Sequence, residues 1–175
     1  AYRYDKSSTL PLNGNGFDFF TYGAALTMTD AIPSLKSDVI NFWKFNASYA
    51  SVGGAPSIGF INELYGTPSG FPFGTTTGLA VPTSGVSANF TPSYTKSFEV
   101  GTEMDLFKKR LSVGINYYNS VSTNDFLSAG TSAASGIGSL RLNAGKMENK
   151  GLEVDLSGTV IKAKDFEWKA GVNFS

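Results

Sequence analysis

Apolar and polar residues alternate with a period of two along most of this 175-residue chain. In the segment 110–127, Leu111, Val113 and Ile115 fall on one side, and Ser112 and Asn116 fall on the other. Successive side chains of a β-strand point to opposite faces, so this pattern predicts a strand with one apolar and one polar face. The pattern recurs in the segments 2–5, 20–28, 43–49, 98–106, 148–160 and 166–174. We therefore expect an all-β chain of about seven strands.

The connections between these segments alternate in length. Longer ones, at 6–16, 53–92 and 127–140, are separated by shorter ones at 30–39, 108–109 and 161–165. In an antiparallel up-and-down meander, alternate connections leave from opposite ends of the sheet. The order therefore predicts one end with long loops and one with short turns, as in outer-membrane barrels, whose long loops are extracellular.

Two all-β architectures fit the alternation. A secreted or cell-surface β-sandwich, acting as a carbohydrate-binding module or adhesin, is one. A membrane barrel is favoured by strand length, by polar faces suited to a wet lumen, and by aromatic residues near strand ends. Those residues are Trp43, Phe107, Phe166 and Trp168. The smallest bacterial barrels have about eight strands, and open edges are costly in lipid, so we expect a piece of a larger barrel.

The composition argues against an enzyme. Histidine and cysteine are both absent, which excludes imidazole and thiol catalysis and cysteine-ligated metals. We expect no catalytic, cofactor or metal site. Lys plus Arg and Asp plus Glu both number 14, and this balance argues against nucleic acid as a partner.

Five segments, in the same order, resemble the SusC/RagA family of TonB-dependent outer-membrane transporters, which is typical of Bacteroidetes. Together they cover about two-thirds of the chain, and residues 53–91 contribute little to the likeness. The segments are RYDKSSTLP at Arg3–Pro11, FFTYGAALTMTDAIP at Phe19–Pro33, INFWKFNASYASVGG at Ile40–Gly54, PSYTKSFEVGTEMDLFKKRLSVGINYYNSVSTNDFL at Pro92–Leu127 and NAGKMENKGLEVDLSGTVIKAKDFEWKAGVNFS at Asn143–Ser175.

The resemblance implies a transmembrane barrel of about 22 strands that encloses a plug domain. Residues 1–175 would be part of this β-barrel domain, without the plug. Such transporters sit in the outer membrane of Gram-negative bacteria, in contact with its lipid, and import nutrients, namely oligosaccharides or peptides. A SusD-like surface lipoprotein covers the outer mouth, and TonB contacts the plug from the periplasm.

Two groups of residues are candidates for contact with plug, solute or lid. Polar residues expected to face the lumen are Glu99, Glu103, Asp105, Asn116, Glu153 and Asp155. Their alternative role is a structural charge network with Arg3, Lys44, Arg141 and Lys169. Aromatic residues of the longest loop, Tyr65, Phe71 and Phe73, are candidates for extracellular contact with solute or lid, or else pack the loop onto its neighbours.

Overall fold

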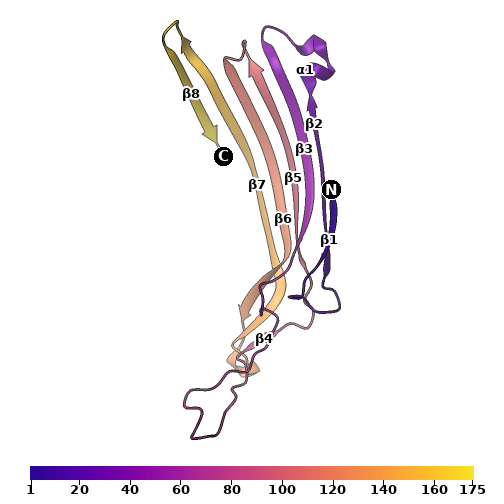
Figure 1. The fold of residues 1–175 in the computed structure, drawn as a ribbon, viewed down its shortest axis with the longest axis vertical. Helices are drawn as coiled ribbons and strands as arrows, with labels where there is room; N and C mark the ends of the chain where they lie inside the picture. Colours follow the sequence, from indigo (N-terminus) through magenta and orange to yellow (C-terminus); the bar gives the residue numbers. More distant parts are fainter.

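The computed structural model describes all residues, 1–175, and consists of one curved sheet with loops at both ends (Figure 1). Its strands hydrogen-bond in the order β1-β2-β3-β5-β6-β7, and β7 also pairs with β8 and β4. The strands are β1 (Tyr2–Lys6), β2 (Gly16–Thr27), β3 (Ile40–Gly54), β4 (Ser84–Val86), β5 (Ser93–Leu106), β6 (Leu111–Gly130), β7 (Ser139–Lys162) and β8 (Glu167–Phe174). All pairings are antiparallel except that of β4, which is a short parallel addition to β7 from the longest loop.

Helical structure is limited to single turns in the connections. These are α1 (Met28–Ala31), η1 (Pro33–Leu35) and η2 (Ala133–Ser135). Met28 was expected to continue the strand before it, but it begins α1, where the chain turns toward Pro33. No helix in the structure is both long and apolar enough to cross a membrane.

The strand register gives the sheet two chemically different faces. Ile115 of β6 lies opposite Thr102 of β5 and Val154 of β7, while its neighbour Asn116 lies opposite Gly101 and Glu153. Residues directly opposite one another share a face, so the apolar positions of neighbouring strands coincide. We call the face that carries Ile115 the outer face and the face that carries Asn116 the inner face.

No second sheet covers the outer face. Only three hydrophobic side chains are buried, namely Leu10, Phe17 and Phe90, and all three belong to the long-loop end. Large side chains along the strands stay exposed, among them Phe45, Phe98, Ile115, Tyr117, Leu152, Leu156 and Val172. A sandwich would bury such residues between two sheets. The alternative of a β-sandwich is therefore wrong.

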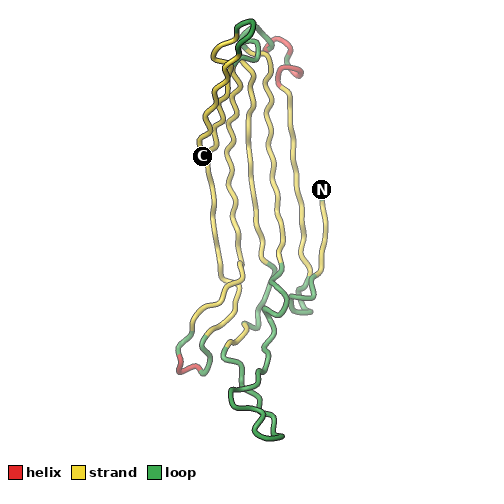
Figure 2. Tube along the Cα trace, turned by 60° about the vertical axis from the view of Figure 1, so that its left-hand side comes forward, coloured by secondary structure: helices red, strands yellow, loops and turns green.

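The two ends of the sheet differ as the connection lengths predicted. The turns β2–β3, β5–β6 and β7–β8 lie at one end, and the loops after β1, β3 and β6 lie at the other (Figure 1, Figure 2). The boundary at the β6–β7 hairpin also differs from expectation. Residues 127–130 and 139–140 were expected in a loop, but they pair with one another at the tip of an extended β6–β7 hairpin, because Leu127 lies opposite Leu142 and Ala129 opposite Leu140.

Candidate functional site

All six polar residues expected in the lumen lie on the inner face. Alternation along β5 puts Glu99, Glu103 and Asp105 on the same side. Asn116 of β6 lies opposite Glu153 of β7, and Asp155 lies opposite Gly114. Together these residues are Glu99, Glu103, Asp105, Asn116, Glu153 and Asp155, and we refer to them as the inner polar group.

One hydrogen bond and one ion pair hold two members of this group to neighbouring strands. Lys44 Nζ of β3 lies 3.6 Å from Glu103 Oε1, and Ser112 Oγ donates a 2.7 Å hydrogen bond to Asp105 Oδ1. The expected charge network is otherwise wrong. Arg3 pairs with Asp5 and Lys169 with Glu167, because each cation reaches an acid two residues away on its own strand. Arg141 pairs with no carboxylate.

The inner polar group is spread along the strands rather than gathered at one point. No group of three or more acidic side chains lies close enough together to hold a metal ion. Of the five carboxylates of this group on β5 and β7, only Glu103 has an ion-pair partner, which is Lys44. This stretch of the inner face is therefore acidic. Its chemistry suits contact with polar or cationic groups along an extended surface.

Arg141 attaches the longest loop to the β6–β7 hairpin, a role that sequence reasoning missed. Its Nη1 donates hydrogen bonds to the carbonyl oxygens of Phe60 at 2.8 Å and of Gly59 and Asn62 at 3.4 Å. Its Nη2 donates to Ser84 Oγ at 3.3 Å, and the guanidinium lies 5.6 Å from the centre of the Phe60 ring. A planar fork of donors is suited to holding several carbonyls at once.

Three phenylalanines pack beside this anchor. Phe60 and Phe90 of the loop meet Phe126 of β6 with ring centres 6.0–6.2 Å apart. Such aromatic contacts contribute about 0.5–1.5 kcal/mol each beyond the area that they bury. The base of the loop is thereby fixed to the hairpin. An isolated Phe gives no periodic signal, so the pairing of Phe60 with Phe126 had no signature in the sequence.

The aromatic residues predicted to contact solute or lid lie farther out on the same loop. Tyr65 and Phe73 have 64% and 79% of their surface exposed, and Phe71, at 41%, covers Gly78. Phe73 and Thr76 exchange two backbone hydrogen bonds in a tight turn at 2.9 and 3.0 Å. Tyr65 and Phe73 are therefore free of the packing role that falls to Phe60 and Phe90, while Phe71 covers Gly78 and keeps the rest of its surface exposed.

The ladder between β6 and β7 is interrupted where the hairpin leaves the other strands. Asn124 has a left-handed backbone (φ 57°) and, like Ala144 on β7, has no partner across the ladder. Asn143 Nδ2 donates 2.8 Å hydrogen bonds to the carbonyls of Asn124 and Thr91, and its Oδ1 accepts from the Thr91 N–H at 3.0 Å. This double bulge joins the hairpin to the end of the long loop.

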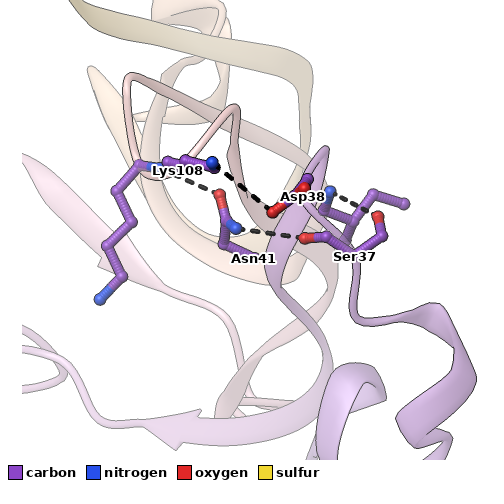
Figure 3. A network of polar contacts seen from close by, with 6 residues as sticks. Ser37, Asp38, Asn41 and Lys108 are labelled. Carbon is purple, nitrogen blue, oxygen red and sulfur yellow. Dashed lines mark hydrogen bonds and ion pairs between the residues drawn. The ribbon is translucent and has the colours of Figure 1, made fainter.

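At the opposite end, a polar network ties two turns together (Figure 3). The Lys109 N–H donates to Asn41 Oδ1 at 3.0 Å, and Asn41 Nδ2 donates to the Ser37 carbonyl at 3.2 Å. Lys108 Nζ lies 3.8 Å from Asp38 Oδ1. The residues 107–109 all have positive φ, so these bonds stabilise a β5–β6 turn of strained conformation.

Comparison with known proteins identifies this arrangement. The sequence matches the family described as TonB dependent receptor-like, beta-barrel, over residues 1–175. The chain belongs to this family. The all-β antiparallel meander, the TonB-dependent receptor assignment and the outer-membrane location expected from the sequence are confirmed. Receptors of this family are transport proteins, which also agrees with the expectation that the chain is not an enzyme.

Two curated TonB-dependent receptors of Formosa agariphila are similar in sequence. P3 is 32% identical over 99% of this chain and 17% of its own length, and P39 is 29% identical over 78% and 13%. The chain thus spans about a sixth of the length of the first of these relatives.

Solved structures share the fold. The RagAB peptide transporter superposes with a TM-score of 0.85 at 22% identity, over 98% of this chain and 19% of that one. The siderophore receptor PirA from Pseudomonas aeruginosa gives a TM-score of 0.55 at 17% identity, over 93% and 28%. This chain is therefore more similar to the RagAB transporter than to PirA in the arrangement of its strands.

Proposed function

We propose that the chain is a section of the wall of a SusC/RagA-like importer, completed by further strands around a plug domain. The observation that carries this proposal is the bare apolar outer face, backed by an acidic inner face and bordered by long loops at one end only. Backbone groups at the edges β1 and β8 need strand partners in lipid, which the rest of such a barrel supplies.

The proposed cargo is an oligosaccharide or a peptide, taken up with energy from TonB acting on the plug. RagAB is described as a peptide importer, which supports the peptide class. A SusD-like lipoprotein is the proposed lid, and the long-loop end is the surface that would meet it. The inner polar group would line the solute path or the contact with the plug.

The orientation of the wall is tested by digesting intact cells that carry the full-length protein with a protease of broad specificity, since residues 55–83 contain no Lys or Arg. We expect cleavage within residues 55–83, because long loops face outward in bacterial barrels, and no cleavage at Lys108 and Lys109. The same digestion of permeabilised cells serves as the control, since it should also reach the short turns. Cleavage of intact cells confined to Lys108 and Lys109 would reverse the orientation.

The contact function of the loop tip is tested by replacing Tyr65, Phe71 and Phe73 together with Ser in the full-length protein. Solutes are first found by growth screens on defined glycans and peptides. We expect uptake to fall at least about ten-fold while the amount of barrel in the membrane is unchanged, since three aromatic contacts of about 0.5–1.5 kcal/mol each are lost.

A matched control removes other exposed apolar side chains from the same loop. Ile58, Leu79 and Val81 are 92%, 73% and 76% exposed, and their triple Ser variant should keep uptake within about two-fold. Equal losses in both variants would mean that the loop needs apolar character in general rather than these rings. Uptake that persists after the proton-motive force is dissipated would contradict a TonB-dependent importer.

A further inference from the structure

The outer face changes abruptly from apolar to charged toward the long-loop end. On β5 the outward series runs from Leu106 to Phe98 and continues with Lys96, and on β7 it runs to Leu152 and continues with Lys150. Phe98 lies opposite Asn119, and Asn119 lies opposite Lys150. The change to charged residues on β5 and β7 therefore occurs at about the same level, with the polar but uncharged Asn119 of β6 between them.

This level matches the expected edge of the hydrocarbon layer. The apolar outer series on β5, from Leu106 to Phe98, spans about nine residues, which is what a tilted strand needs to cross a bilayer. Lys96 is the next outward position on that strand. Charged groups at this level lie where lipid headgroups begin, beside the same strands that we propose to be embedded in lipid.

The charges at this edge are mostly positive. Lys96, Lys146 and Lys150 point outward with a single acid, Glu148, so three positive charges meet one negative charge. Glu148 Oε1 lies 3.5 Å from Lys150 Nζ and accepts a 3.4 Å hydrogen bond from Asn119 Nδ2. Neither Lys96 nor Lys146 takes part in an ion pair, and both are exposed.

The excess is confined to β5–β7. Farther along the same edge, Lys6 of β1 and Asp18 of β2 also face outward and balance one another. Lys96 and Lys150 have one strand between them and are offset by two residues along the ladder, so their backbones are about 12 Å apart, within reach of two long side chains.

We propose that Lys96, Lys146 and Lys150, here called the lysine triad, form a binding site for the phosphate groups of a lipid in the outer leaflet. The apolar strands below would hold its acyl chains, and the ammonium groups would meet its phosphates. The proposal rests on the membrane placement and orientation given under the proposed function, because only then does this edge meet headgroups. Lysines beside an anionic lipid surface favour binding electrostatically.

The experiment uses the full-length protein in detergent and a bis-phosphorylated lipid A as the probe, with bound lipid counted by native mass spectrometry. The variant K96Q/K146Q/K150Q should bind the probe about 100-fold more weakly, since each such lysine contributes a factor of about five. The variant K96R/K146R/K150R should bind like the wild type. A control with equal loss of charge, K109Q/K162Q/K164Q at the short-turn end, should also bind like the wild type.

Several outcomes would overturn the site. One is that the triple Gln variant binds the probe as strongly as the wild type does. Another is that the triple Gln variant loses as much affinity for dephosphorylated lipid A as for the probe, which would assign the contact to acyl chains alone. Displacement of the probe by millimolar inorganic phosphate would indicate a site for free phosphate rather than lipid. If the triple variant fails to insert, single Lys96→Gln must still weaken binding about five-fold. If the full-length protein binds the probe as expected but imports no glycan or peptide, the result would count against the proposed cargo and not against this site.

Discussion

Replacing Ile115 with Arg in the full-length protein is expected to lower the stability of the folded barrel by about 2–4 kcal/mol. Ile115 lies on the outer face between Thr102 and Val154, near the middle of the apolar series of β6, where 38% of its surface is exposed. An arginine there would face hydrocarbon. Unfolding in urea from lipid vesicles measures the change directly.

Asn116→Arg provides the matched control one residue away. Its side chain lies on the inner face opposite Glu153, so the new charge meets water and a carboxylate, and we expect a loss well below 1 kcal/mol. An arginine scan of residues 112–118 should therefore give losses at Val113, Ile115 and Tyr117 only. Equal losses of stability at odd- and even-numbered positions would contradict a strand with lipid on one face only.

Arg141→Ala is expected to release the base of the long loop while the sheet stays folded. The variant loses four hydrogen bonds, three of them to carbonyls, and the contact with the Phe60 ring. Hydrogen bonds to charged groups contribute about 1.5–3 kcal/mol, so we expect local opening to become easier by about 2–4 kcal/mol. Backbone amide exchange in residues 57–63 should accelerate by about 30- to 700-fold.

Two variants bracket this result. Arg141→Lys keeps the charge but lacks the planar fork, so it should restore only part of the protection. Arg110→Ala removes a guanidinium from the opposite end of the sheet and should leave exchange in residues 57–63 unchanged. Unaltered exchange in the Arg141→Ala variant would show that Phe60, Phe90 and Phe126 hold the loop without it.

The two-faced sheet could be predicted because it depends on local order in the sequence. Alternation determines which side chains share a face within a strand, and matching apolar faces restricts the register between strands. This is why Glu103, Asn116 and Glu153 were assigned to one face correctly. Loop lengths likewise predicted the two unlike ends, since a meander leaves little freedom in the placement of its connections.

Contacts between distant segments could not be predicted in the same way. Arg141 was expected to pair with a carboxylate of the inner face, but it binds carbonyls about 80 residues earlier in the sequence. Backbone carbonyls are present at every residue, so no residue type marks them as partners. Ion pairs such as Arg3 with Asp5 depended on rotamers within one strand, and the pattern of alternation says nothing about rotamers.

The interrupted ladder at Asn124 and Ala144 has a consequence for how such receptors diversify. In a continuous ladder, a one-residue slip of the pairing moves every side chain of the slipped strand to the other face. A bulge on each strand absorbs that change locally. Related receptors with this interruption can therefore lengthen, shorten or replace the hairpin tip and the loop that it carries, while the strands below it keep their faces.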